Sequence, residues 1–158
     1  GKAAGALASA AVPAPLPMPR ADFYLIAKPR FRAQPLRLAC ELVRKAYEAE
    51  LWTLVLARDT AQAEELDDLL WDMGEDAYIP HQIAGRDDED ELTPVLIADP
   101  QTDAPMRPLV VNLRDAPVTG GFERVLEVVP ADESARGPLR ERWKHYKALG
   151  FEVNKYDM

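Results

Sequence analysis

FYLIAKPRFRAQPLRLACELVRKAYEAELWTLVLA, residues 23–57, contains two apolar runs separated by an amphipathic segment. The first run, 23–27, is short, aromatic and branched, which is typical of a buried strand. After Pro35, apolar residues recur at i, i+4, i+7 and i+11, namely Leu36, Cys40, Val43 and Tyr47. This spacing predicts a helix that reaches about Glu50, and 52–57 then predicts a second buried strand. The stretch is therefore expected to form a strand–helix–strand unit.

The rest of the chain repeats this alternation. Asp59 with Gln62 three residues later is typical of a helix N-terminus, and the helix that follows carries Ala63, Leu66, Leu69, Leu70 and Met73 on one side. After an extended segment at 78–85, three more apolar runs predict strands at 95–98, 109–113 and 124–129. A last helix should begin near 135–137, because Pro138 cannot lie deep inside it. Such a pattern predicts an α/β fold with a mainly parallel sheet covered by helices on both faces.

Length and composition indicate one globular domain. The chain has 158 residues, of which 47% are hydrophobic and 29% charged, and this suits a single core. Residues 1–20 are rich in Ala and Pro, and we expect a flexible tail that is partly non-native, with Met18 as the native start and 21–158 as the domain. The chain has no apolar run of bilayer length, so a cytoplasmic location without membrane contact is expected. Its single cysteine, Cys40, leaves no internal disulfide or zinc set.

The C-terminal run LRERWKHYKALGF, residues 139–151, departs from the acidic character of the chain. The protein has 27 Asp and Glu against 19 Lys and Arg, a net charge of −8, which argues against broad binding of duplex nucleic acid. At helical pitch, Arg140, Lys144 and Lys147 fall on one face with Trp143 at its border, while Leu139, Tyr146 and Leu149 are expected in the core. Arg142 lies on the apolar side and should be buried against a carboxylate. The cationic face predicts an anionic partner.

Catalytic signatures are absent from the sequence. The first strand is followed by Lys28-Pro29-Arg30-Phe31, so there is no glycine-rich phosphate loop, and there is no G-x-S-x-G elbow. His81 is a candidate general base, although a hydrogen-bonded structural role is favoured because no nucleophile pairs with it in the sequence. The charge run at 86–91 is expected to be a solvated loop. No cofactor or metal is predicted.

Trp71 points away from the apolar side of its predicted helix. Two interpretations stay open for it. The indole either covers the next loop, or anchors another protein, a role in which Trp is favoured.

From about Pro19 to Lys155, the chain resembles the chi subunit of bacterial DNA polymerase III holoenzyme, an accessory of the clamp-loader complex. The resemblance rests on ordered motifs across nearly the whole domain: Phe23-Tyr24-Leu25, Leu66-Asp67 to Leu70-Trp71, Tyr78-Ile79-Pro80-His81 with Ala84-Gly85, Val129-Pro130, and 140–151. It implies a Rossmann-like three-layer fold without a nucleotide-binding loop. It also implies a noncatalytic subunit that contacts DNA only indirectly.

The resemblance further implies two partner surfaces. One binds the acidic, aromatic-ended C-terminal tail of single-stranded DNA-binding protein, and it carries over onto Arg140 and Lys144, with Arg136, Trp143 and Val129 as neighbours. The other binds the psi subunit of the clamp loader or a helicase, and it carries over onto Trp71 and Tyr78. Two features depart from the family pattern: Gly137-Pro138 lies at the start of the last helix, and Trp143 stands where a tyrosine is common.

Three functional hypotheses follow. The first is a noncatalytic adaptor between the replicative polymerase assembly and coated single-stranded DNA. The second is a small α/β enzyme that uses His81 near the acidic run. The third is direct binding of single-stranded DNA, with stacking on Trp143 and Tyr146 along the basic helix.

Overall fold

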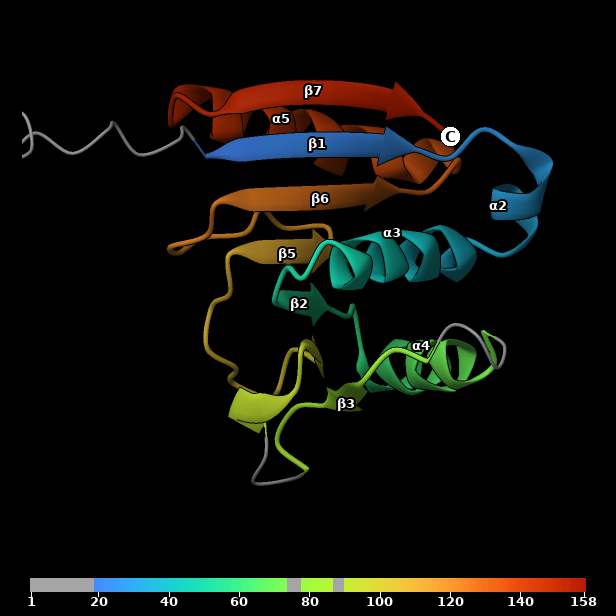
Figure 1. The fold of residues 1–158 in the computed structure, drawn as a ribbon. Helices are drawn as coiled ribbons and strands as arrows, with labels where there is room; N and C mark the ends of the chain where they lie inside the picture. The colour runs from blue at the N-terminus through green and yellow to red at the C-terminus, as the bar shows by residue number, and fades with distance from the viewer. Residues whose placement is uncertain (1–18, 74–77, 87–89) are drawn as a thin grey trace, which may run out of the picture.

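The protein forms one seven-stranded parallel sheet, described in a computed structural model for residues 19–73, 78–86 and 90–158 (Figure 1). The strand order is β3-β4-β2-β5-β6-β1-β7, and every strand pair is parallel. The strands are β1 (Arg20–Leu25), β2 (Thr53–Leu56), β3 (His81–Ile83), β4 (Val95–Ala98), β5 (Leu109–Asn112), β6 (Arg124–Val129) and β7 (Glu152–Asp157). The predicted α/β class with a mainly parallel sheet is confirmed.

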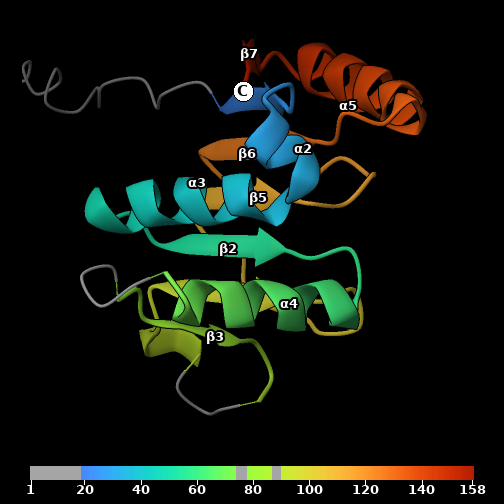
Figure 2. The same cartoon turned by 90° about the vertical axis from the view of Figure 1, so that its right-hand side faces the viewer.

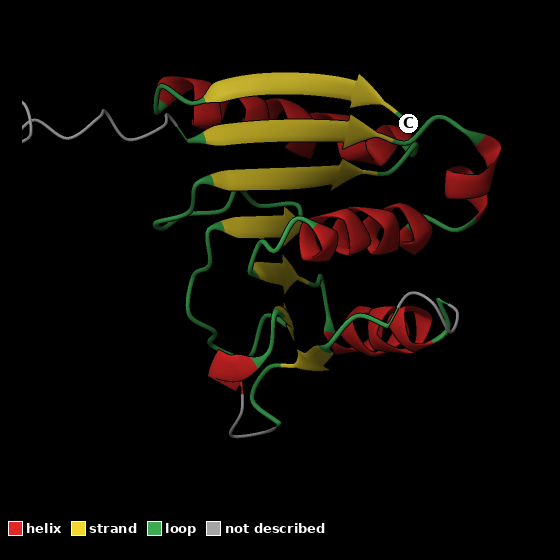
Figure 3. Ribbon diagram, in the orientation of Figure 1, coloured by secondary structure: helices red, strands yellow, loops and turns green. Residues whose placement is uncertain are grey.

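Helices cover both faces of this sheet (Figures 2 and 3). Helices α2 (Pro29–Ala33), α3 (Leu36–Glu48) and α4 (Thr60–Trp71) lie on one face, and α5 (Arg136–Ala148) lies on the other, over β6, β1 and β7. Two short 3-10 turns, η1 (Asp90–Leu92) and η2 (Glu133–Ala135), complete the described elements. In this part of the chain, no helix has the length and apolar character needed to span a membrane.

Alternation along each strand divides the core between the two faces. In β2, Val55 packs under α3 and α4, whereas Leu54 packs on the opposite face. The α5 side of the sheet is filled by Phe23, Val125 and Tyr146 among others. Beyond the reach of α5, the same face is covered by the segment between β4 and β5, through Ala104 and Met106. Every central strand is thus buried on both sides.

Local signals account for most helix boundaries. The Asp59 side chain accepts a hydrogen bond from the Gln62 amide at 2.7 Å, which confirms the predicted N-cap. Helix α5 begins at Arg136, as Pro138 requires. Most of the predicted tail, residues 1–18, lies outside the described residues. Pairing in β1 starts at Arg20, one residue before the expected domain start.

Three features differ from the expectations. Helix α2 and strand β7 were not predicted. Phe31 is the buried residue of α2, so the helix has no repeating apolar pattern. Strand β7 lies at the edge of the sheet, and most residues of its sequence, EVNKYD, are polar. Leu149, expected in the core, is 59% exposed, because α5 ends at Ala148 and the chain turns away through Gly150. The φ of Gly150 is +84°, a left-handed conformation that suits a glycine helix terminus.

A buried polar network fastens α5 to the sheet. Nε of Arg142 lies 2.9 Å from a carboxylate oxygen of Glu127 on β6, an ion-pair contact, and its Nη1 donates to the Asp115 carbonyl. The Tyr146 hydroxyl donates to Glu127 at 2.6 Å and accepts from the Val118 amide. Burial raises the pKa of Glu127, whereas the Arg142 guanidinium opposes that rise. Arg142 is therefore the buried, carboxylate-paired residue that the sequence predicts.

Replacing Arg142 with Ala should lower the free energy of unfolding by about 3–5 kcal/mol, because Glu127 would then be left as an uncompensated buried charge. Urea unfolding followed by circular dichroism measures this loss. Arg140→Ala is the matched control on the same helix, and it should change stability by no more than about 0.5 kcal/mol. Equal stability of the Arg142 variant and the wild type would show that the network does not hold α5.

Burial of Cys40 in α3 predicts an inert thiol. Desolvation raises its pKa to about 12, so almost no thiolate exists near neutral pH. A thiol reagent at about pH 8 should leave the folded protein unmodified and label one equivalent after unfolding in urea. Rapid labelling of the folded chain would contradict this placement of α3.

Candidate functional site

A row of cations follows the exposed side of α5. Arg136, Arg140 and Lys144 lie four residues apart, so they share one helix face, and all three are exposed. Arg140 and Lys144 have no hydrogen-bond or ion-pair partner among the residues that the structure describes. Arg136 meets only Glu133, at 3.8 Å, in an exposed contact of little strength. The helix, and not ion pairing, sets the position of these side chains. They face solvent, and their positive charge is largely unneutralised within the described structure.

Trp143 supplies an apolar wall beside this row. Its ring lies 5.2 Å from that of Phe23 on β1, measured between centroids, and the side chain is only half-buried. Tyr146, one turn further along the helix, is fully buried in the same cluster. Its burial raises the pKa of its hydroxyl, which is bonded to Glu127. The expectation that Tyr146 stacks on single-stranded DNA is therefore wrong, because the ring is an internal packing residue.

A small cavity lies where the row begins. It measures about 290 Å³ and is formed at the carboxyl ends of β1 and β6, between α2 and α5. Its lining includes Val129 and Arg136, so the structure brings together these two predicted residues. Leu25, Ile26 and Leu139 provide further apolar walls. The charged lining is Arg32 and Arg136 against one carboxylate, Asp132, so cations outnumber anions there.

Two cations near this site were not identified from the sequence. Arg32 lies on α2 and has no ion pair among the described residues. The one sequence feature that indicates this helix is Pro29, because proline is favoured at the first position of a helix. Lys155 lies on β7 and pairs in register with Phe23, and alternation places it on the α5 side of the sheet. Residues 152–157 do not alternate regularly between apolar and polar side chains, so the sequence did not predict a strand there and Lys155 could not be placed on the sheet.

These residues form a coherent receptor for one kind of ligand. We call Arg32, Val129, Arg136, Arg140, Trp143 and Lys144 the α5 surface. Its cations lie along a helix, and its apolar cavity and half-buried indole lie next to them. Guanidinium groups bind carboxylates bidentately, while lysine adds a point charge. The arrangement fits an acidic chain that carries an apolar side chain.

A second exposed cluster lies at the other end of the sheet. Trp71 at the end of α4 is 57% exposed and Tyr78 is 60% exposed, with ring centroids 5.8 Å apart. Trp71 also packs over the His81 ring at 4.9 Å. The structure therefore brings the predicted aromatic pair together, and we call it the Trp71–Tyr78 surface.

His81 beneath this surface has both ring nitrogens occupied. Nδ1 lies 2.7 Å from the Ile79 carbonyl oxygen, and Nε2 lies 3.1 Å from the Asp67 carboxylate. The ring is buried, and the Trp71 indole packs against it. Among the described residues, no group of three His, Cys, Asp or Glu side chains could hold a metal ion. The geometry favours the structural role of His81 over the role of general base.

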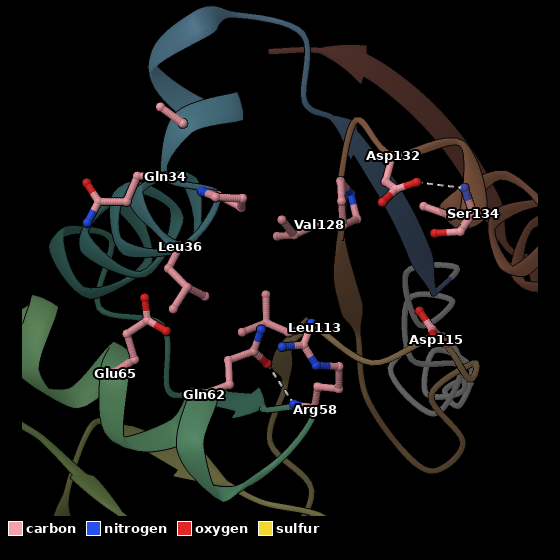
Figure 4. A pocket seen from close by; sticks show the side chains of 14 residues that line it. Gln34, Leu36, Arg58, Gln62, Glu65, Leu113, Asp115, Val128, Asp132 and Ser134 are labelled. Atoms are coloured by element: carbon pink, nitrogen blue, oxygen red, sulfur yellow. Dashed lines mark hydrogen bonds between the residues drawn. The ribbon is translucent and has the colours of Figure 1, made fainter.

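A further cavity, of about 450 Å³, lies at the carboxyl ends of β5 and β6, where doubly wound folds bind their ligands (Figure 4). Leu36, Leu113 and Val128 form its apolar part. Its rim carries the carboxylates of Glu65, Asp115 and Asp132 beside one guanidinium, Arg58. An acidic rim repels phosphate groups, so this cavity does not resemble a dinucleotide site.

Comparisons with known proteins agree with the resemblance. The family model described as "DNA polymerase III chi subunit, HolC" matches residues 18–154. DNA polymerase III subunit chi of Pseudomonas aeruginosa is 33% identical over 143 residues, which cover 88% of this chain and 96% of that protein. The protein of the same name from Escherichia coli is 31% identical over 121 residues, covering 75% of this chain and 82% of the relative. That of Haemophilus influenzae is 25% identical over 120 residues, covering 74% and 83%.

Proposed function

Because this chain belongs to the DNA polymerase III chi-subunit family, we propose that it is a noncatalytic accessory subunit that links the clamp-loader complex to single-stranded DNA-binding protein. The link is made by binding the acidic, aromatic-ended C-terminal tail of that protein. The observation that carries the proposal is the α5 surface, where unpaired cations stand beside an apolar cavity in a protein of net charge −8.

The chemistry of the α5 surface matches each part of such a tail. Arg140 and Lys144 attract its acidic side chains, because neither cation is engaged within the described structure. The terminal aromatic ring meets the apolar cavity or the exposed edge of Trp143. Flexible acidic tails lose entropy on binding, and exposed ion pairs are screened by salt, so the affinity should be modest and should fall as salt rises.

The partner of the Trp71–Tyr78 surface is the psi subunit or a helicase in this proposal. Two large aromatic side chains, both more than half exposed, are typical anchors of a protein interface. The surface lies at the end of α4, whereas the α5 surface lies on the opposite face of the sheet (Figure 2). Both partners therefore have room to bind at once, as a linking subunit requires.

Arg140→Ala should weaken binding of a tail peptide by about 1–3 kcal/mol, the range for a lost charge-assisted contact. Isothermal titration calorimetry with a synthetic peptide of the tail measures this change. Lys45→Ala, which removes an exposed cation of α3, is the control and should leave the affinity unchanged. If the folded Arg140 variant bound the peptide as tightly as the wild type does, Arg140 would not belong to the binding site and the proposal would be contradicted.

Trp71→Ala should spare peptide binding and impair the complex with psi, since the two surfaces share no described residue. Size-exclusion chromatography with psi and calorimetry with the peptide test the two interactions separately. Loss of both interactions in a folded variant would mean that the surfaces are not independent.

A further inference from the structure

A second cationic groove lies between α3 and α4, apart from both surfaces described above. It is a cavity of about 420 Å³ on the face of the sheet opposite to α5 (Figure 2). Arg37, Glu41 and Arg44 line it from α3. Leu69 of α4 lines it from the other side, with Asp72 and Met73, which directly follow that helix. We call it the α3–α4 groove.

The side chains that line the groove carry more unpaired positive charge than unpaired negative charge. Arg30, at one end, lies 3.5 Å from Glu41, so these two charges largely cancel. Arg37 and Arg44 have no hydrogen-bond or ion-pair partner in the described part of the chain. Among the described residues that line the groove, this leaves the Asp72 carboxylate to balance them, and it makes no ion pair there.

The Arg44 guanidinium has an unsatisfied donor, which does not stabilise the folded protein. Its Nε is enclosed by protein and has no hydrogen-bond acceptor among the residues that the structure describes. Enclosed donors without a partner destabilise the fold, so most of them are satisfied in native proteins. A carboxylate brought into the groove would supply the missing acceptor once the guanidinium turned toward it.

The remaining walls of the groove indicate a protein segment rather than a nucleic acid. Leu69 and Met73 are half-buried and offer an apolar floor for aliphatic side chains. No aromatic residue stands among the described residues that line the groove, so bases would find no stacking platform. The carboxylate of Asp72 would also repel a continuous phosphate backbone.

We propose that the α3–α4 groove binds an acidic amphipathic helix of a partner protein. Arg37 and Arg44 are seven residues apart, which places them about 10 Å apart along α3. A bound helix would meet them with two acidic residues at the same seven-residue spacing. Its apolar residues between those two would pack on Leu69 and Met73, in the helix-in-groove mode of recognition.

The probe for this proposal is a synthetic amphipathic peptide with Glu at positions seven apart and Leu on the same face. Both ends of the peptide are blocked, so that it offers no terminal carboxylate to the α5 surface. Fluorescence anisotropy of the labelled peptide is measured with the full chain. Arg37→Gln and Arg44→Met should each weaken binding about fivefold to tenfold, whereas Lys45→Ala, which removes an exposed cation of α3 outside the groove, should not change it.

Thermal unfolding of Arg44→Met provides a second readout. Methionine keeps much of the apolar stem and removes the unsatisfied donor, so the melting temperature should stay the same or rise. A marked fall would identify Arg44 as a structural residue and overturn the proposal. It would also be overturned by failure of the peptide to bind, by equal binding of a version with Lys in place of Glu, or by preferential binding of a single-stranded oligonucleotide.

Discussion

The contact between Arg142 and Glu127 fixes the position on which the candidate site depends. Glu127 lies within β6, fully buried, and it receives Arg142 and Tyr146 from α5 and Asn112 from β5. Charges buried in this way are costly unless they are paired and hydrogen-bonded, so α5 has few alternative positions on the sheet. With that side of the helix fixed, Arg136, Arg140 and Lys144 are directed into solvent.

The same helix therefore separates two uses of charge. On its inner side, a guanidinium is neutralised by a buried carboxylate, and this interaction belongs to the fold. On its outer side, Arg140 and Lys144 have no partner among the described residues, and in an acidic protein they attract an anionic chain locally. The α3–α4 groove repeats the second arrangement with Arg37 and Arg44. Together with the exposed Trp71–Tyr78 pair, the described residues thus present three separate surfaces, two cationic and one aromatic.

The sequence patterns predicted the strands that are buried on both faces. They missed the edge strand β7 and the short helix α2, which bury few side chains. The runs at 95–98 and 124–129 are apolar enough to announce strands buried on both faces, and both were placed within a residue. Strand β7 pairs on one side only and alternates weakly, so Lys155 was missed with it. The cavity with Arg32 could not be foreseen, because it forms only where α2 and α5 approach the ends of two paired strands. In contrast, Arg142 was placed correctly, because one cation on the apolar side of a helix must find a buried carboxylate.

The most direct test of the α5 surface is chemical-shift mapping of the isotope-labelled protein with the C-terminal tail peptide of single-stranded DNA-binding protein. Amide shifts are predicted to concentrate at 129–144 and at residues 25–32, with the Trp143 indole among the most affected. The same peptide lacking its last few residues should leave these signals in place. Shifts that concentrate on α4 or around His81, or a spectrum unchanged by the intact peptide, would contradict the central claim that the cationic side of α5 receives an acidic tail.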